Sequence, residues 1–538
     1  MPKFLSNLSL VNAEKILFSC YLEHKNLHAK KIKYETIVST LEKDIQRARY
    51  EQFVLKLASA YDGYKFYLPA FLDFRGRIYR NGLLQFHERD LTRSLLLFAD
   101  SGSKSEKTDD EINYIVSVAC AFHVKSFNKI EDAYNFLNSF LKDYSSNWAI
   151  CSRVSKNPYQ FMSKMHAIIN KDYNLMRRMP ITQDASASAY QIMSYFLTDL
   201  DFAKKTNLLY DTNDTIHDVY EGFLEELLSY INSAEIPASI KKIMLRNNFL
   251  DRKTVKSIYM PIIYGKTVHS TCTSLLKGKF KLDFDKPYKC FPFASVFYNF
   301  FKTRYSGMDC LISLIRSIGW LVSASDRSVK YGVHFFSTVQ NYTQTNDVPI
   351  WVYNRLSRKR HRVSMRITSD TRDRRKSEIS TFVNFIHQRD ANIAMRVVQK
   401  FQDKEPNAPI YTVHDNFITT AEYSSMLPHI YGNVFLELGA PLHIIHAFIY
   451  DNIIKPLISI SIDPIKYSNI KFDIKKIIPE KELREYLEAH KPAKLDKRNE
   501  AMWRNKIKLI LKSYKDYWYY VGIMSVGILM KGQLMKII

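Results

Sequence analysis

Apolar and polar positions alternate with two different periods along this chain. Residues 12–60, 109–178 and 216–264 place apolar side chains among charged ones at helical spacing, and the last of these segments stops at Gly265. A short apolar run of strand character, MPITQD, ends at Asp184, and the helical pattern of DASASAYQIMSYFLTDL begins there. The pattern predicts a mixed, α+β organisation of helices and short strands.

A second run of strand character raises a question about function. In IYTVHDNFITT, residues 410–420, a β-prone run leads into His414 and Asp415, and a further β-prone run follows. This pattern predicts a hairpin with a carboxylate at its tip. The apolar segment YWYYVGIMSVGILM, residues 517–530, is shorter than the ~20 residues that a membrane-spanning helix needs. We therefore expect a buried or poorly ordered tail and no stable membrane association.

The charge balance points to a polyanionic partner. Lys and Arg number 78 against 54 Asp and Glu, a net charge of +24, which is typical of proteins that bind nucleic acid or an acidic membrane surface. A basic protein without such a partner remains the alternative. The stretch from Arg355 to Lys376 holds ten Lys or Arg and two Asp, and is either a solvated loop or helix face or a nucleic-acid contact. The six cysteines are scattered without a C-x-x-C pair, which predicts neither a disulfide framework nor a zinc site.

Asp184 and Asp415 are candidate catalytic residues because each closes an apolar strand-like run. If the two strands were neighbours, two carboxylates would lie a few ångströms apart, which is costly unless a cation neutralises them. Oxygen ligands of this kind suit Mg²⁺, and paired Mg²⁺ ions are typical of nucleotidyl transfer. The alternative for each residue alone is a turn or helix cap.

A predicted helix at residues 251–266 carries a third candidate group. At 100° per residue, Arg252, Lys256 and Tyr264 fall within an arc of about 120° on one face. Two cations beside an aromatic ring suit a nucleoside triphosphate. An ordinary basic helix with a buried tyrosine remains the alternative.

Five blocks of the chain, in order, resemble one enzyme family. They are DFRGRIY (Asp73–Tyr79), DASASAYQ (Asp184–Gln191), RKTVKSIYMPIIYG (Arg252–Gly265), NFIHQRDA (Asn384–Ala391) and HDNF (His414–Phe417). They are similar to the D-x-x-G-R, D-x-S-x-S-x-x-Q, R-x-x-x-K with Tyr-Gly, N-F-x-H-x-x-D and H-D-S-F blocks of single-subunit DNA-directed RNA polymerases. This is the phage and mitochondrial type, which includes polymerases encoded on linear mitochondrial plasmids. The resemblance covers roughly residues 40–430.

The resemblance implies a right-hand polymerase fold: a palm with a small antiparallel sheet, helical fingers inserted in the palm, and an incomplete thumb. We expect thumb remnant at 1–63, palm at 64–205 and 388–480, fingers at 206–387, and a C-terminal tail of unknown role at 481–538. Because 72 residues precede Asp73, we also expect a chain that is shortened at its N-terminus relative to the family.

The resemblance also implies roles for single residues. Asp184 and Asp415 would hold two Mg²⁺ ions, Lys256 would contact the triphosphate and donate a proton to pyrophosphate, and Arg252 would add a phosphate contact. Tyr264 would select ribose, and Gly265 would allow close approach of the template. The remaining contacts to nucleic acid would come from Arg77, Arg93, His387 and His414. Ala185 and Ala189 depart from the family's glycines, and Ser257 stands where a second basic residue is common.

The implied function is synthesis of RNA on a DNA template from ribonucleoside triphosphates, by a monomer in the mitochondrion. Two alternatives stay open at this point. A related DNA polymerase or reverse transcriptase would share the two carboxylates, although no Y-x-D-D box is present. A non-catalytic, nucleic-acid-binding remnant would explain the basic charge.

Overall fold

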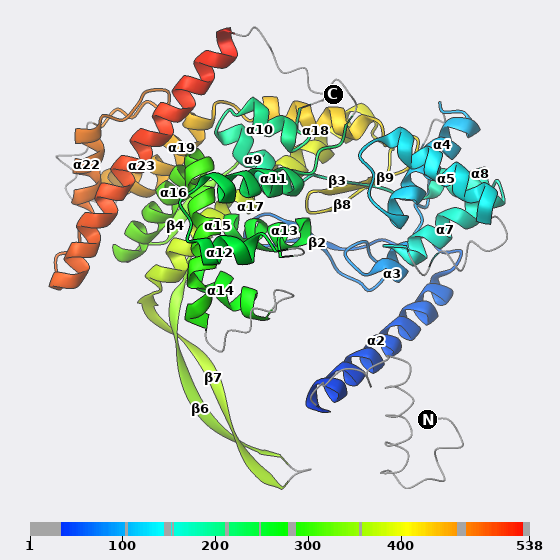
Figure 1. The fold of residues 1–538 in the computed structure, drawn as a ribbon, viewed down its shortest axis with the longest axis horizontal. Helices are drawn as coiled ribbons and strands as arrows, with labels where there is room; N and C mark the ends of the chain where they lie inside the picture. The colour runs from blue at the N-terminus through cyan, green and yellow to red at the C-terminus, as the bar shows by residue number, and fades with distance from the viewer. Residues whose placement is uncertain are drawn as a thin grey trace.

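The computed structural model describes residues 34–102, 106–144, 152, 155–209, 215–246, 249–277, 287–354, 358–459 and 470–530. Figure 1 shows a helical body from which one long two-stranded ribbon and one N-terminal helix project. The α+β prediction is confirmed, since helices predominate and the described strands form small antiparallel sheets. Of the helical segment predicted at residues 12–60, residues 12–33 lie outside the described part of the chain.

The first part of the chain leads up to the central sheet. Helix α2 (Tyr34–Tyr61) is followed by the short pair β1 (Ala70–Leu72) and β2 (Ile78–Arg80). The helices predicted within residues 109–178 are confirmed, and they bury a core of their own. With the short helix before them, these helices are α3 (Asp90–Ser94), α4 (Asp109–Val124), α5 (Ile130–Tyr144), α7 (Pro158–Ile169) and α8 (Tyr173–Arg178).

The central sheet joins two distant parts of the chain. Its strands are β3 (Ile181–Asp184), β8 (Ile410–Val413) and β9 (Asn416–Thr419), in the antiparallel order β3–β9–β8. The predicted strand before Asp184 and the predicted hairpin around Asp415 are both confirmed. Ile181 pairs with Thr419 and Asp184 with Asn416, so the end of β3 lies beside the β8–β9 turn.

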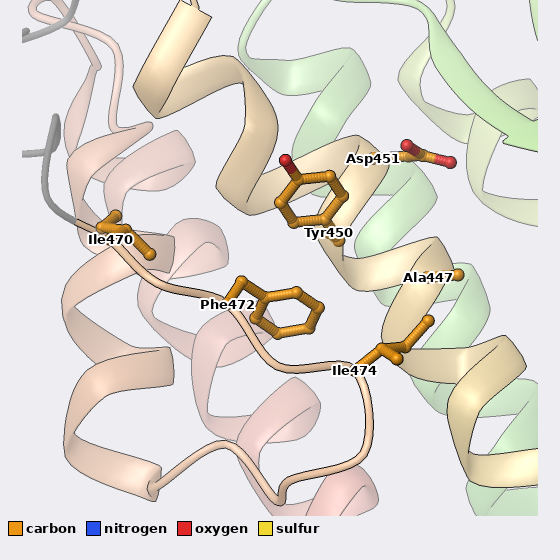
Figure 2. Close-up of a pocket in the computed structure, with 6 residues that line it drawn as sticks. All are labelled: Ala447, Tyr450, Asp451, Ile470, Phe472 and Ile474. Atoms are coloured by element: carbon orange, nitrogen blue, oxygen red, sulfur yellow. The ribbon is translucent and has the colours of Figure 1, made fainter.

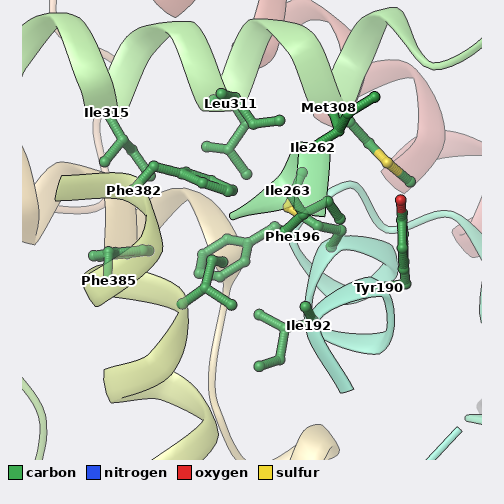
Figure 3. Packing of buried hydrophobic residues seen from close by; sticks show 14 of the residues in the cluster. Tyr190, Ile192, Phe196, Ile262, Ile263, Met308, Leu311, Ile315, Phe382 and Phe385 are labelled. Carbon is green, nitrogen blue, oxygen red and sulfur yellow. The ribbon is translucent and has the colours of Figure 1, made fainter. Parts of the chain in front are cut away.

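The helices between these strands share the main hydrophobic core (Figure 3). They are α9 (Ser188–Phe196), α10 (Leu200–Lys205), α11 (Val219–Ser233), α12 (Ala238–Met244), α13 (Arg252–Ile263), α14 (Val268–Lys277), η3 (Pro287–Cys290), α15 (Phe291–Arg304), α16 (Ser306–Ala324) and α17 (Arg374–Lys404). Buried residues of α9, α13, α16 and α17 meet there, among them Phe196, Ile263, Leu311 and Phe385. Phe417 of β9 and buried residues of α9, the helix that follows Asp184, belong to this core.

Two hairpins precede α17. The smaller pairs β4 (Val329–Gly332) with β5 (Ser337–Gln340), and the larger pairs β6 (Thr343–Asn354) with β7 (Lys359–Arg372) and projects from the body (Figure 1). Of the two alternatives for the basic stretch Arg355–Lys376, a loop or helix face does not describe residues 359–372, which form strand β7, and a nucleic-acid contact stays a prediction. Alternating β-branched residues and cross-strand partners in β6 extend β7 as a strand.

The C-terminal part completes the main core. It comprises α18 (Met426–Leu436), α19 (Pro441–Ile449), the π-helical turn η4 (Tyr450–Ile454), α20 (Lys455–Ser459), α22 (Glu480–Ala489) and the 34-residue α23 (Lys497–Met530). Leu483, Trp503 and Tyr517 are among its buried residues. Within the apolar segment predicted to be buried, Tyr517 and Val521 are buried and Tyr519 is exposed.

The described helices offer two places with the length and apolar character of a membrane span. One is α16, and the other is the bent pair of α18 with residues 441–458 taken together. In α16, 78% of the apolar window is buried within the protein, as in the core helix of a globular fold. Burial of this kind accounts for the apolar character of α16 without a bilayer.

Candidate active site

The β8–β9 turn presents Asp415 at the edge of the central sheet. Val413 pairs with Asn416, so only His414 and Asp415 form the turn. His414 has a φ of 60°, a left-handed conformation that glycine adopts more readily than other residues. Residues in such sparsely populated backbone conformations cluster at functional sites. The geometry therefore favours a role for the histidine ring and not only for its backbone.

The register of β3 brings Asp184 to the same edge. Asp184 pairs with Asn416, and the Ala185 N–H donates to the Asp415 carbonyl oxygen at 3.3 Å. The two predicted carboxylates are therefore neighbours. Asp184 is exposed at the mouth of the site and surrounded by protein on its other sides, and this desolvation, followed by the Asp415 charge, raises its pKa to about 6.

A buried ion pair lies behind the two carboxylates. Arg77 donates through Nη2 to Oδ2 of Asp390 at 2.7 Å, and their side chains are 13% and 6% exposed. Burial and then the Asp415 charge raise the pKa of Asp390 to about 6, while Arg77 opposes this shift. Arg77 was predicted to contact nucleic acid, whereas Asp390 had no predicted role. The NFIHQRDA block contains Asp390, but its partner is more than 300 residues away in the sequence.

Tyr264 and His387 face each other beside this pair. Tyr264 follows the last residue of α13, and its ring centroid lies 5.1 Å from that of His387. Burial and then the Asp390 charge raise the pKa of Tyr264, so its hydroxyl stays protonated. Arg75 Nη1 lies 2.8 Å from Nδ1 of His387, and burial together with Arg77 and Arg75 lowers the pKa of His387 to about 3. His387 is therefore neutral near pH 7.

His414 lies in a group of aromatic rings. Its ring centroid is 5.0 Å from that of Tyr79 and 5.5 Å from that of His87. Burial lowers the pKa of His414 to about 4, with Arg77 the next cause. Sequence reasoning missed Tyr79 and His87 as neighbours of the turn, although Tyr79 closes the DFRGRIY block. The stacking of Tyr79 on His87 depends on tertiary packing that no local pattern reveals.

The three predicted cationic residues, Lys256, Arg252 and Arg93, differ in their partners. Lys256 is exposed, and its Nζ lies 5.2 Å from the ring centroid of Tyr220. Its charge lowers the pKa of Asp184, but the burial of Asp184 has a larger effect and raises that pKa. Nε of Arg252 donates to Oδ2 of Asp218, the N-cap residue of α11, at 2.5 Å. Arg93 donates from Nε to the Glu88 carbonyl oxygen at 2.8 Å and also lowers the pKa of Asp184. Lys256 and Arg93 therefore act on Asp184 through their charge, whereas Arg252 is held by a carboxylate.

Gly265 has a φ of 88°, so a side chain there would be strained. A Cβ at this position would lie 2.8 Å from Cγ2 of Ile379 and 3.1 Å from Nη2 of Arg316. The close neighbours of the glycine in this structure are therefore residues of α17 and α16. Tight packing is a reason for glycine here that is separate from the predicted approach of a template.

Within the described residues, no group of three or more His, Cys, Asp or Glu side chains is arranged to hold a metal ion. A pair of carboxylates, Asp184 and Asp415, is the available donor set at the sheet edge. A cavity of about 400 Å³ elsewhere is lined by Ala447, Tyr450, Asp451, Ile470, Phe472 and Ile474 (Figure 2). It includes none of the predicted site residues, so it is separate from the candidate active site.

Comparison with known proteins places this geometry in a family. Residues 129–508 match the family described as DNA-dependent RNA polymerase. A protein of Zea mays named "Probable DNA-directed RNA polymerase" is 35% identical over 504 residues, which is 85% of this chain and 45% of that protein. A protein of Agaricus bitorquis with the same name is 26% identical, covering 72% of this chain and 37% of that protein.

A relative in Nicotiana sylvestris is named "DNA-directed RNA polymerase 1, mitochondrial" and is 26% identical over 70% of this chain and 39% of its own length. The chain thus spans less than half the length of each of these three relatives. The family match itself covers well over half of the chain, and it includes four of the five blocks singled out from the sequence. The chain therefore belongs to the DNA-dependent RNA polymerase family of the phage and mitochondrial type, as those blocks predicted.

Proposed function

We propose that this chain extends RNA on a DNA template by nucleotidyl transfer from ribonucleoside triphosphates. The observation that carries the proposal is the β3–β9 register, which sets Asp184 beside Asp415 at one edge of the sheet. Around this pair lie a cation from α13, a protonated tyrosine and two neutral histidines. Such a site suits a substrate that carries phosphates, a sugar and a base.

The two carboxylates fit divalent cations. Burial and then the like charge of Asp415 raise the pKa of Asp184, and a bound cation would offset the repulsion between the two carboxylates. Two protein carboxylates leave coordination positions free, which suits Mg²⁺ because it retains waters and binds substrate phosphates. Two Mg²⁺ ions held by Asp184 and Asp415 would lower the pKa of the primer 3′-hydroxyl and stabilise the pyrophosphate leaving group.

The other residues have positioning and proton-transfer roles in this proposal. Lys256 reaches from α13 towards the carboxylates, where it contacts the triphosphate and donates a proton to the departing pyrophosphate. Arg252 becomes a second phosphate ligand once the triphosphate competes with Asp218 for its guanidinium. Arg93 contributes further positive charge that lowers the pKa of Asp184.

Tyr264 is the proposed selector of ribose. Its hydroxyl stays protonated beside Asp390 and can donate to or accept from a sugar hydroxyl. Its ring is positioned by His387, which Arg75 holds in turn. His387 and His414 offer neutral ring nitrogens to the primer end and the hybrid, and Arg77 helps to position the helix that carries His387 through its pair with Asp390. Gly265 admits the template backbone next to Tyr264.

We also propose the arrangement in space and the setting of this reaction. Residues 64–205 and 388–480 form the palm, residues 206–387 the fingers, and residues up to 63 part of a thumb. DNA and RNA are the macromolecular partners, and the protein acts as a monomer. A mitochondrial setting is supported by the relatives of Nicotiana sylvestris and Nicotiana tabacum, whose names carry that compartment.

The test is extension of an RNA primer on a DNA template by a single nucleotide in the presence of Mg²⁺. Intact protein is compared with Asp415→Ala and with Asp403→Ala, a matched carboxylate loss at an exposed position of α17. We expect ribonucleotide addition that Asp415→Ala abolishes and Asp403→Ala preserves. Preferential addition of deoxyribonucleotides would favour a DNA polymerase. Template binding without addition of either nucleotide would favour a non-catalytic remnant.

A further inference from the structure

Helix α23 is anchored to elements that carry site residues. On its buried side, Trp503 packs near Trp320 of α16, with 6.2 Å between ring centroids. Further along, the Tyr517 hydroxyl donates to the carbonyl oxygen of Phe196 at 2.8 Å, at the end of the helix that follows Asp184. Figure 1 shows α23 lying across this side of the body with α16 and α19. The helix is therefore an integral part of the core behind the site.

A charged contact links α23 to the first turn of α17. Lys506 Nζ donates to Oε1 of Glu378 at 2.5 Å, and the two side chains are only 18% and 28% exposed. Glu378 immediately precedes Ile379, one of the two side chains that touch the Gly265 position. The contact thus holds the turn of α17 that packs against the Tyr264–Gly265 turn.

The second side chain at Gly265 is Arg316 of α16. Its Nε and Nη2 atoms are buried and have no hydrogen-bond partner among the described residues. Burial lowers the pKa of Arg316, and the charge of Glu378 is the largest opposing influence. Glu378 therefore balances two cations, Lys506 through a direct contact and Arg316 through space. Removal of Lys506 would leave the carboxylate free to draw the unpartnered Arg316 nitrogens away from Gly265.

We propose that Lys506 and Glu378 are positioning residues for sugar selection: they hold Arg316 and Ile379 against Gly265, and so fix the adjacent Tyr264 hydroxyl. This inference rests on the proposed function, because it concerns the choice between ribose and deoxyribose. It assigns a task to the C-terminal helix, whose contacts through Trp503, Lys506 and Tyr517 are with α16, α17 and α9 and not with Asp184 or Asp415. Coupling of this kind passes through packed side chains and charge pairs.

The experiment compares single-nucleotide extension by the full chain, Lys506→Met, Glu378→Gln and the charge swap Lys506→Glu with Glu378→Lys. Lys508→Met is the matched control, since Lys508 is an exposed lysine on the same helix. The readout is the ratio of kcat/KM for a ribonucleotide to that for the matching deoxyribonucleotide. Because unfolded molecules add neither nucleotide, this ratio does not depend on the folded fraction.

We expect Lys506→Met and Glu378→Gln to lower the ratio by roughly tenfold, within the range that packed networks transmit. The ratio should fall mainly because kcat/KM for the deoxyribonucleotide rises, as expected when the Tyr264 hydroxyl no longer discriminates, and the charge swap should restore part of the lost selectivity. Lys508→Met should leave the ratio unchanged. An unchanged ratio in Lys506→Met, even with a lower Tm, would overturn the inference and leave α23 a purely structural helix. If the unmodified chain added no nucleotide, the proposed function itself would fail, which is a separate outcome.

Discussion

The buried pair of Arg77 and Asp390 allows the sharpest test of how the site is held together. Replacing Asp390 with Ala removes the only described acceptor of the Arg77 guanidinium, whose Nε already has no partner. The guanidinium would then remain buried and unpaired. Breaking such a pair from one side typically costs about 3–5 kcal/mol of folding free energy. The loss should extend to catalysis, since Asp390 lies beside Tyr264 and Asp415.

The geometry supports a value in this range. A donor–acceptor distance of 2.7 Å places the charge centres about 4 Å apart, where attraction is about 4 kcal/mol at an effective dielectric constant of 20. Asp390→Asn keeps the shape of the side chain and a neutral acceptor oxygen, so we expect roughly half the loss, about 2 kcal/mol. Asp403→Ala removes an exposed carboxylate from the same helix and should cost less than about 0.5 kcal/mol.

The reciprocal variant, Arg77→Met, should depend on pH. The folded pKa of Asp390 is about 6, above the unfolded value of about 3.9, so its ionisation already lowers stability as the pH rises through this window. Without Arg77 the folded pKa rises further, and the window of lost stability extends to higher pH. Arg77→Met should therefore cost less at pH 5, where the carboxyl is protonated, than at pH 8.

Urea unfolding followed by tryptophan fluorescence measures these differences. For a slope of about 3 kcal/mol per molar urea, Asp390→Ala should lower the midpoint by about 1–2 M. The reasoning would be refuted if Asp390→Ala and Asp403→Ala shifted the midpoint by the same small amount. An Arg77→Met cost that did not change between pH 5 and pH 8 would refute the electrostatic part alone.

Four further predictions follow from the site and the projecting hairpin. His414→Gly should leave the free energy of unfolding within about 1 kcal/mol of wild type, because relief of the left-handed strain offsets the lost ring contacts. Primer extension should nevertheless fall at least tenfold, and unimpaired extension would contradict a role for the ring. Tyr264→Phe should reduce the preference for ribonucleotides about tenfold while ribonucleotide addition stays nearly normal, as competition between the two nucleotides would reveal. Primer extension should decline as the pH falls through about 6, where Asp184 takes up a proton. A higher Mg²⁺ concentration should move the midpoint of this decline to lower pH, and a midpoint insensitive to Mg²⁺ would argue against Asp184 as a ligand. Three arginines share one face of the β6–β7 hairpin, namely Arg360, Arg362 and Arg366. Replacing all three should reduce the slope of log DNA affinity against log salt concentration by up to about 3, measured by fluorescence anisotropy. An unchanged slope would make this a solvated face.

The helices within residues 34–60, 109–178 and 216–264, strand β3 and the hairpin at Asp415 could be predicted from the sequence because local periodicity and turn chemistry encode them. The β6–β7 hairpin could not, because its basic side chains obscured the alternation that its cross-strand partners make evident. The shared local pattern of Asp184 and Asp415 would bring the two carboxylates together only if their strands were neighbours, and the β3–β9 register supplies that pairing. The roles of Asp390, His87 and Tyr79 depend on contacts between segments far apart in the chain. Charge pairing of Arg252 with Asp218 is equally invisible to pattern, since it joins one helix to the cap of another.

The pairing of β3 with β9 has a consequence for how the protein acquires activity. More than two hundred residues separate Asp184 from Asn416, so closing this loop in an unfolded chain would cost about 5 kcal/mol of entropy. Contacts of such high order form late in folding, after the intervening helices have shortened the gap. During synthesis on the ribosome, β3 stays unpaired until the whole of β9, which ends at Thr419, has emerged. The pair of Asp184 and Asp415 is therefore among the last features to assemble, and incomplete chains that end before β9 lack the proposed active site.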